Sequence, residues 1–400
     1  MNRSDNQPNS NKSVLIVEFS EFRHDARVAK EVNSIKNLGF NTTLIMFSEY
    51  VKHKTIINEE RLISILYPFH NKKGKGYLGR CFWILCAFVV VMRIWFQVLK
   101  ARADYFHVHN LFFLIPAYIK TRLISAKIIY DAHELHSEHQ SNSTTIGRIL
   151  NTWNYYYEGF FIRRVDVVIE ASQERAEYVR DIYKIKEPFV INNHALVQDG
   201  TEEKVLHKMA KLPESAKILL YTGGVYGNRR LDKTIEALSK MSHFDIYLVI
   251  VGFMSARARE RINSIVHKYG VEKKVIILPP VNSSQVVEVA STADVGIIPL
   301  YGDSVNTKLS ALNKVSEYLM AGLPMICTNY HNLSKIVYSN SVGQVGETFE
   351  VEDSSSIKLA IEKVLKSRAA FSKNARELAL KEYNWNREEA KLKSIYEKEI

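Results

Sequence analysis

The sequence predicts an α/β protein with two doubly wound parallel sheets, and three observations lead to this prediction. Short runs of β-branched and aromatic residues alternate with helical segments through the first half of the chain, which is typical of βαβ units. The alternation restarts at Lys217, after a polar interval at 198–215. Polar or glycine-containing turns follow several of the expected strands, where α/β proteins bind ligands. The 400 residues are enough for two such domains.

The first half begins with a strand, a helix that ends at Gly39, and a second strand. The strands of this half are expected at 14–18, 42–47, 104–109, 126–131 and 165–170, and the helices at 26–38, 81–99, 115–124 and 146–164. Each expected strand is short and rich in residues that favour β-structure. The half ends near 188–193, and we expect an N-terminal domain at 13–195.

The second half repeats the pattern, with a helix from about Leu231 after its first strand. Strands are expected at 218–222, 246–251, 275–278, 295–299 and 325–328. Ser310 is expected to cap a helix at 311–321, and Gly322 to end it in the left-handed conformation ahead of Pro324. The expected boundaries are 196–384 for the C-terminal domain and 385–400 for a terminal helix that packs back toward the N-terminal domain.

The composition of the chain limits which kinds of binding partner we expect and in which cellular compartment we expect the protein. The net charge of +11 predicts attraction to a membrane surface, nucleic acid or phosphorylated ligands, although a solvated basic surface without a dedicated partner is the alternative. Cys81, Cys86 and Cys327 stand in apolar contexts without a CxxC pair, so we expect reduced core residues in the cytoplasm rather than disulfides or a zinc site. The polar residues 1–13 do not resemble a signal peptide.

One apolar segment needs separate treatment. Residues 81–92 form a run of 12 residues without a charge, shorter than the roughly 20 that a spanning helix needs. Basic residues precede this run and aromatic residues lie in and after it: Lys72, Lys73, Lys75, Arg80, Trp83, Trp95 and Phe96. This pattern suits in-plane contact of Cys81–Leu99 with an anionic leaflet at the inner face of the membrane, and a helix packed on a sheet is the alternative.

In the second half, Gly223 and Gly224 begin a turn between a strand and a helix, and Arg229 follows in the same turn. Glycines let the backbone approach a ligand, and an arginine can hold phosphate oxygens. The turn matches neither GxGxxG nor a Walker sequence, and an ordinary tight connection is the alternative. Glu317 can accept two hydrogen bonds from a ribose diol, and Lys314, one turn before it, either adds charge near the phosphates or is a solvated lysine.

In the first half, two expected strands end in 104–110 and 130–135, where polar residues would face the crevice. His133 is our preferred active-site residue and His109 its support. Asp25 is expected to cap a helix, and Arg27 either holds an anion or is exposed. A metal site is disfavoured, because His133, His136 and His139 recur every third residue, which drifts around a helix and lacks the HExxH pattern. The chain has no GxSxG elbow for a Ser-His-Asp hydrolase.

Together these stretches resemble the retaining, nucleotide-sugar-dependent glycosyltransferases of the family 4 type (group 1 glycosyltransferases). The resemblance extends from about residue 13 to 400 and rests on DARV at 25–28, HVHN at 107–110, YDAHEL at 130–135, TGGVYGNRRL at 222–231, ADVGIIPL at 293–300, NKVSEYLMAGLPM at 313–325 and YNWNREEAKLKSIYE at 383–397. It implies the GT-B fold, with two Rossmann-like doubly wound domains facing a central cleft.

The resemblance also implies roles and chemistry. Glu317 would hold the donor ribose, Arg229 the diphosphate, and His133 would lie near the transferred sugar. Such enzymes retain the anomeric configuration and need neither a metal nor a cofactor. Among donor-side residues we include Lys314, Asn313, Gly223 and Gly224, and on the acceptor side Arg27 and His109.

Three departures from the family pattern leave alternatives open. Leu309 replaces a glutamate that reads the sugar in many relatives, with Asn306 and Asn313 as compensating hydrogen-bonding groups. Val225 or Tyr226 stands where a basic residue is common, and 21–27 replaces an N-terminal glycine loop. We expect a hexosyltransferase acting on a glycan or lipid-linked acceptor in surface polysaccharide biosynthesis. A non-catalytic nucleotide-sugar-binding subunit and a GT-B-like sugar-nucleotide epimerase are the alternatives, and nucleic-acid binding ranks last because the basic residues are dispersed.

Overall fold

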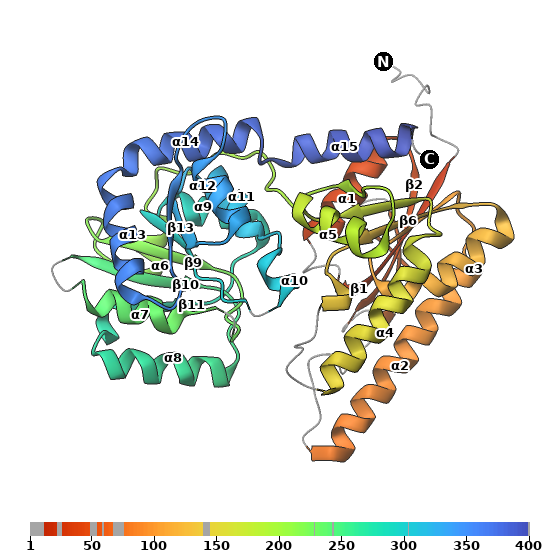
Figure 1. The fold of residues 1–400 in the computed structure, drawn as a ribbon, viewed down its shortest axis with the longest axis horizontal. Helices are drawn as coiled ribbons and strands as arrows, with labels where there is room; N and C mark the ends of the chain where they lie inside the picture. The colour runs from red at the N-terminus through yellow and green to blue at the C-terminus, as the bar shows by residue number, and fades with distance from the viewer. Residues whose placement is uncertain are drawn as a thin grey trace. The chain divides into compact units, whose positions relative to one another are not determined.

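The computed structural model describes residues 12–21, 26–48, 54–57, 60–66, 76–138, 145–227, 229–241, 244–302 and 304–398. The chain divides into two compact units. In Figure 1, where colour follows residue number, the first unit runs from red to yellow-green and includes the blue end of the chain, and the second runs from green to blue. Unit 1 comprises Met1–Asn192 with Glu389–Ile400, and unit 2 comprises Asn193–Glu388. Asp25, His139 and Asn228, which the sequence singled out, lie outside the described residues.

Unit 1 is built on an eight-stranded sheet in the order β3-β4-β2-β1-β5-β6-β7-β8. Its strands are β1 (Ser13–Glu21), β2 (Asn41–Ser48), β3 (Lys54–Ile57), β4 (Glu60–Leu66), β5 (Tyr105–Val108), β6 (Lys127–Ala132), β7 (Val167–Glu170) and β8 (Phe189–Val190). Neighbouring strands are parallel except β3 and β4, which pair antiparallel at the edge. Because β5 is buried along its whole length, both faces of the sheet centre are covered.

The helices of unit 1 connect these strands. They are α1 (Ala26–Asn37), α2 (Gly76–Lys100), α3 (Leu114–Ile124), α4 (Thr145–Ile162) and α5 (Gln173–Tyr183), with short 3-10 turns η2 (Leu111–Phe113) and η3 (His136–Glu138). Ser172 caps α5 by accepting a hydrogen bond from the Arg175 amide. The final turns of α15 (Trp385–Lys398) also belong to this unit, and there the ring of Tyr396 packs 5.2 Å from that of Phe40.

Unit 2 contains a six-stranded, fully parallel sheet in the order β11-β10-β9-β12-β13-β14. Its strands are β9 (Lys217–Thr222), β10 (Ile246–Val251), β11 (Val275–Leu278), β12 (Val295–Ile298), β13 (Met325–Thr328) and β14 (Gly346–Phe349). Its helices are α6 (Val205–Ala210), α7 (Leu231–Ser239), α8 (Ala256–Tyr269), α9 (Val286–Ser291), α10 (Val305–Lys308), α11 (Asn313–Met320), α12 (His331–Tyr338), α13 (Ser354–Lys366) and α14 (Arg368–Lys381), with η4 (Glu272–Lys274) and η5 (Ser283–Gln285).

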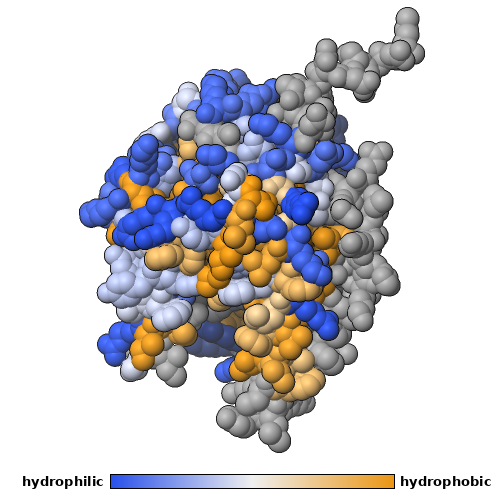
Figure 2. Space-filling view, turned by 90° about the vertical axis from the view of Figure 1, so that its right-hand side faces the viewer, coloured by the Kyte–Doolittle hydropathy of each residue, from blue (hydrophilic) through white to orange (hydrophobic). Residues whose placement is uncertain are grey.

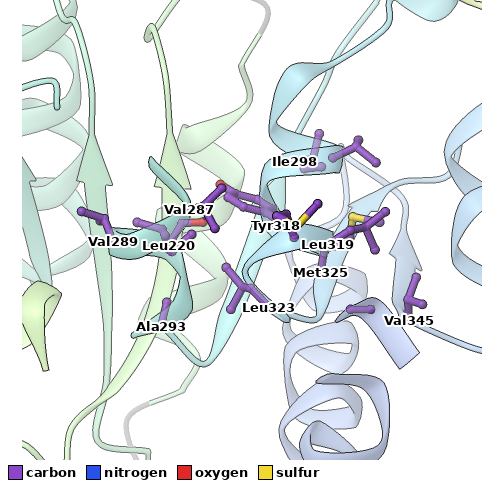
Figure 3. Close-up of a cluster of buried hydrophobic side chains, with 14 of the residues drawn as sticks. Leu220, Val287, Val289, Ala293, Ile298, Tyr318, Leu319, Leu323, Met325 and Val345 are labelled. Carbon is purple, nitrogen blue, oxygen red and sulfur yellow. Dashed lines mark hydrogen bonds between the residues drawn. The ribbon is translucent and has the colours of Figure 1, made fainter. Parts of the chain in front are cut away.

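The core of unit 2 fixes the position of α11. Figure 3 shows Tyr318 and Leu319 of this helix packed with apolar side chains of the sheet and of α9. The Tyr318 hydroxyl accepts a hydrogen bond from the Thr222 amide at 3.0 Å, which ties the helix to the end of β9. Burial of these side chains therefore sets where the exposed face of α11 lies relative to the turn after β9.

The structure confirms the predicted fold class and corrects one helix boundary. Gly322 has φ of 63°, and the amide of Leu323 donates to the carbonyl of Tyr318, so the predicted glycine end of α11 is confirmed. The prediction that Ser310 caps this helix is wrong. Helix α11 begins at Asn313, and the Ser310 hydroxyl donates instead to the carbonyl of Thr307 at 2.9 Å. No helix in the described part of the chain has both the length and the apolar character needed to cross a membrane.

Candidate functional site

In unit 2, the turn after β9 is held against the turn after β10. Gly223 has φ of 101°, a conformation that favours glycine, and its amide donates to the carbonyl of Val251 at 2.9 Å. A Cβ atom on Gly252 would lie only 2.1 Å from the Gly223 carbonyl oxygen. Both strand ends therefore require glycine.

Lys314 of α11 lies along this glycine turn. Its Nζ is 4.0 Å from the centre of the Tyr221 ring and would be 3.6 Å from a Cβ on Gly223. The pKa of Lys314 is lowered to about 7, mainly by desolvation and also by the nearby charge of Arg229, while the charge of Glu317 acts in the opposite direction. Lys314, Arg229 and Glu317, three of the predicted donor-side residues, thus lie close together. The alternative that Lys314 is a solvated lysine is wrong.

Arg229 lies in a pocket with other cationic side chains. Its Nη1 is buried without a hydrogen-bond partner among the described residues. The pocket has a volume of about 460 Å³ and is also lined by Arg257 and Arg261 of α8 and by Ser255, which caps that helix. Sequence reasoning missed this contribution of α8, because nothing local in the sequence connects Arg257 and Arg261 to the turn after β9. Asp232 also lines the pocket but pairs with Arg230, so cations are in excess and the arrangement favours an anionic ligand.

Glu317 and Asn313 lie one turn apart on α11. The Glu317 side chain is partly buried, whereas Asn313 is exposed and accepts a hydrogen bond from Asn193 Nδ2 at 3.0 Å. Gly224 lies in the turn after β9, where its carbonyl accepts a hydrogen bond from the Tyr221 hydroxyl at 2.7 Å. All the predicted donor-side residues therefore belong to unit 2 and to two segments of it, 221–229 and 313–317.

In unit 1, Arg27 is buried and fully engaged by its own chain. Its Nε donates to Glu31 at 2.9 Å, its Nη1 to the carbonyl of Ile191 at 2.9 Å, and its Nη2 to both oxygens of Asp131 at 2.6 and 2.8 Å. The exposed-arginine alternative is wrong. Sequence reasoning missed Glu31, although its spacing of four residues from Arg27 on one helix predicts such a pair.

A chain of histidines leads from this ion pair toward the end of β6. His109 Nδ1 lies 3.0 Å from His133 Nε2 and 3.5 Å from an Asp131 oxygen. Burial lowers the pKa of His109 well below its ordinary value, and the neighbouring His107 and His133 act in the same direction, so His109 is neutral at pH 7. Arg175 holds the His133 carbonyl at 2.8 Å, so both ends of this residue are positioned.

The same histidines approach carboxylates closely enough to raise the question of a metal. Two groups have candidate ligand atoms within 4.8 Å of one another: Glu31, His107, His109 and Asp131, and Glu18, His109 and His133. In the first group the Arg27 guanidinium already supplies positive charge to both carboxylates. His136 joins neither group among the described residues.

Comparison with known proteins gives the context of this geometry. Residues 202–378 match the family described as glycosyl transferases group 1. The chain is 24% identical over 147 residues to the D-inositol 3-phosphate glycosyltransferase of Xylanimonas cellulosilytica, a match that spans 36% of this chain and about a third (34%) of that protein.

Solved structures are similar over almost the whole chain. Sucrose-phosphate synthase of Thermosynechococcus elongatus has a TM-score of 0.75 at 15% identity, covering 96% of this chain and 98% of its own. Anabaena HepE in complex with UDP and glucose has a TM-score of 0.70 at 13% identity, covering 96% and 99%. The lipopolysaccharide outer core galactosyltransferase WaaB has a TM-score of 0.62 at 12% identity, covering 97% and 100%.

Proposed function

Because the chain belongs to the family of glycosyl transferases group 1, we propose that it moves a sugar from a nucleoside diphosphate sugar to an acceptor hydroxyl with retention of the anomeric configuration. Its two parallel sheets have the GT-B fold of the solved relatives. In this proposal unit 2 binds the donor, and unit 1 provides the residues that meet the acceptor. The complex of HepE with UDP and glucose supports a nucleotide-sugar donor.

The observation that carries the proposal is the pair of cations beside the glycine turn. Lys314 and Arg229 lie close enough for the charge of one to lower the pKa of the other. Two cations held together in a partly desolvated place repel each other, and a diphosphate bound between them would relieve this repulsion. The amides of Val225 and Arg229 are already paired within the chain, so neutral donors to the same phosphates would come from the other amides of this turn.

Glu317 would bind the other end of the nucleotide. A carboxylate accepts both hydroxyls of a ribose diol, and Glu317 lies one turn beyond Lys314 on α11, next to the phosphate position. Asn313, exposed at the start of the same helix, would donate to the sugar. Leu309 stands where many relatives have a glutamate that reads the sugar. We propose that Asn313 and Asn306 contact the sugar in its place.

His133 would act in unit 1 and Arg27 would support it indirectly. Each nitrogen of the buried Arg27 guanidinium already donates to a group of the chain, to Glu31, Ile191 or Asp131, so we treat it as a positioning residue. Asp131 orients His109, which in turn fixes His133 through a 3.0 Å contact. His133 is the partly exposed member of the set and therefore the one able to contact the transferred sugar.

The proposed reaction balances without a cofactor. The bond between the anomeric carbon and the diphosphate oxygen breaks, and the acceptor oxygen bonds to that carbon on the same face. The acceptor proton passes to the departing phosphate. The charge that develops on this phosphate is stabilised by Lys314, Arg229 and the backbone amides, which are in place before the reaction starts.

The acceptor that we propose is a glycan or lipid-linked glycan in surface polysaccharide biosynthesis, with the enzyme in the cytoplasm at the inner face of the membrane. The structural similarity to WaaB, named as a lipopolysaccharide galactosyltransferase, supports this class. The basic balance of the chain fits an acceptor carried by an anionic lipid phosphate.

The test is a panel of UDP-, GDP-, ADP- and CMP-sugars, scored for binding by calorimetry and for slow sugar release by chromatography. We expect one nucleotide family to bind, Glu317→Gln to weaken that binding, and the control Glu362→Gln on α13 to leave it unchanged. His133→Ala should remove sugar release while nucleotide binding persists. Absence of binding across the panel would overturn the proposal.

The departure at Leu309 favours one second candidate, a non-catalytic subunit that binds the nucleotide sugar. Leu309 follows the short helix α10 and offers no hydrogen-bonding side chain. Tight binding without release in the presence of a lipid-linked acceptor extract would favour this candidate over the transferase. Conversion of the donor sugar without any acceptor would instead indicate an epimerase.

A further inference from the structure

Helix α2 is apolar on two opposite faces, although only one of them is packed. Val90, Ile94 and Val98 form a buried stripe against the rest of unit 1. On the opposite side the exposed fractions remain high, for example 59% for Phe88 and 54% for Phe96. The exposed large apolar side chains of this helix are Phe82, Ile84, Leu85, Phe88, Val89, Met92, Phe96 and Leu99. A helix at an ordinary protein surface turns polar residues to water, which α2 does not.

Helices α3 and α4 carry exposed apolar side chains of the same kind. Leu123 is 75% exposed and Trp153 68% exposed. The exposed large apolar side chains of these helices are Ile119, Leu123 and Ile124 on α3, and Ile149, Leu150, Trp153, Tyr156 and Phe160 on α4. On α4 the positions 149, 153, 156 and 160 follow helical spacing, so they line a single stripe.

The three helices form one continuous surface, which we name the three-helix face. Trp95 Nε1 of α2 donates to the carbonyl of Phe112, which begins the turn into α3, at 3.0 Å. The rings of Tyr118 on α3 and Phe161 on α4 are 5.7 Å apart. Figure 2 views this side of the molecule and shows apolar side chains gathered in its central and lower part, with hydrophilic residues around them.

The charges on this face have one sign. Among the described side chains of the three helices, the exposed charged residues are Arg93, Lys100, Arg122 and Arg148. Their one acidic residue, Glu158, is buried and accepts hydrogen bonds from two tyrosine hydroxyls of unit 1. Glu138 of η3 lines a pocket together with Arg148, but cations remain in excess around the apolar side chains. An excess of cations around an apolar surface attracts an anionic partner and repels a second copy of the same face.

Several cations on or beside this face lie over aromatic rings. Lys100 Nζ is 4.1 Å from the ring centre of Phe96, and the guanidinium of Arg164, just after α4, is 3.9 Å from that of Phe160. Such side chains keep an apolar stem against the surface and raise the charged head away from it. With Trp153 and Tyr156 exposed beside them, this is the composition of an interface between hydrocarbon and lipid headgroups.

We propose that the three-helix face binds in the plane of an anionic lipid bilayer. Its apolar side chains enter the boundary between headgroups and acyl chains, and the surrounding arginines and lysines contact lipid phosphates. The occupant is a lipid surface because a protein partner would need acidic residues matched to each cation, whereas an anionic leaflet supplies charge at every position. The inference extends the contact expected from residues 81–99 to three helices and does not depend on the transferase reaction.

The test uses the full chain and vesicles of phosphatidylcholine, with or without about one third phosphatidylglycerol. In flotation assays we expect binding to the anionic vesicles that weakens with salt but keeps a salt-resistant part from the apolar insertion. Trp153 fluorescence should shift to the blue and be quenched by brominated acyl chains, and Trp153→Phe should remove most of that signal.

Two kinds of variant separate the contributions. Phe88→Gln with Leu123→Gln should lower vesicle affinity about tenfold or more, and so should Arg93→Glu with Arg148→Glu. The matched controls are Leu359→Gln, an exposed leucine of unit 2 on α13, and Arg259→Glu on α8, which should change nothing.

Circular dichroism and sedimentation velocity establish that each variant is folded and report its oligomeric state. Failure of the folded wild-type chain to bind anionic vesicles would overturn the proposal. So would vesicle binding that the four substitutions leave intact, or a wild-type dimer that the apolar substitutions dissociate in the absence of lipid. Nucleotide binding by unit 2 is measured separately, so loss of one property does not imply loss of the other.

Discussion

Arg27 Nη2 lies 2.6 and 2.8 Å from the two carboxylate oxygens of Asp131, a residue 104 positions away in sequence. Both side chains are buried. Burial by itself would raise the pKa of Asp131, but the Arg27 charge and a hydrogen bond from His107 outweigh it and hold that pKa well below its ordinary value. Helix α1 and strand β6 are thereby joined by a charged contact beneath the proposed active-site histidine.

Asp131→Asn should therefore destabilise unit 1 strongly. The substitution leaves the buried Arg27 guanidinium with less compensating charge, and breaking such a pair costs about 3–5 kcal/mol. Urea denaturation at pH 7 measures the free energy of unfolding. The control is Asp181→Asn, where the carboxylate pairs with Arg180 at the surface and the expected change in stability is small. Equal losses in the two variants would contradict this account.

Features that depend on neighbouring residues could be predicted from the sequence, whereas features that depend on contacts between distant residues could not. The glycine end of α11 was predictable because Gly322 and Pro324 act within a few residues. The burial of Arg27 was not, because it depends on Asp131 of a distant strand and on the carbonyl of Ile191. Ser310 was misassigned because α11 begins at Asn313 and the Ser310 hydroxyl donates to the carbonyl of Thr307 in α10, a local bond that competes with helix capping.

The residues of the candidate site divide in the same way, into those predicted from local sequence and those whose contacts only the fold reveals. Residues 313–317 were recognised as one ligand-binding segment because helical spacing places Lys314 and Glu317 one turn apart. Their meeting with Arg229 depends on the packing of α11 against β9 through Tyr318, which only the fold reveals. The arginines of α8 were overlooked for the same reason, since nothing local in the sequence connects that helix to the turn after β9.

Nucleotide binding should be accompanied by uptake of a proton at Lys314. The pKa of this lysine is about 7 in the free protein, so much of it is neutral at pH 8. A bound diphosphate favours the charged form and raises the pKa toward its ordinary value, so binding takes up close to one proton at pH 8 and almost none at pH 6. Calorimetry in two buffers of different ionisation enthalpy measures this proton directly.

The matched variants for this prediction are Lys314→Met and Lys268→Met. Both lysines lie over a tyrosine ring, at 4.0 and 5.2 Å, but Lys268 is exposed on α8. Lys314→Met should remove the proton uptake and weaken nucleotide binding about tenfold to a hundredfold. Lys268→Met should do neither. Proton uptake that persists in Lys314→Met would assign the titration to another group.

The stability of unit 1 should fall as the pH rises, in part because of Glu158. Burial raises the pKa of this carboxyl from 4.5 to about 7, against the opposing effect of hydrogen bonds from Tyr130 and Tyr183. A raised pKa in the folded state means that the contribution is complete below pH 4.5 and is lost as the pH rises through about 7. The expected loss is about 3 kcal/mol.

Glu158→Gln isolates this contribution, because glutamine resembles the protonated carboxyl and does not titrate. We expect the free energy of unfolding of the variant to depend less on pH between 4.5 and about 7, the window between the two pKa values, than that of the wild type. Glu170, whose pKa burial raises to about 8, titrates in both proteins, so the difference between them is the relevant quantity. Parallel pH profiles would show that Glu158 is ionised in the folded state throughout.

Substitution of Gly252 should disturb the contact that holds the turn after β9 against the turn after β10. Gly252→Ala places a Cβ atom 2.1 Å from the Gly223 carbonyl oxygen, a backbone atom that can move only if the whole turn shifts. We expect nucleotide affinity to fall about tenfold or more and the unfolding free energy to drop by about 1–3 kcal/mol. Gly227→Ala, in the same turn but with no atom within 4 Å of the new Cβ among the described residues, is the control and should bind nucleotide like the wild type. If both alanine variants bound equally well, the contact between the two strand ends would have no role in shaping the phosphate site.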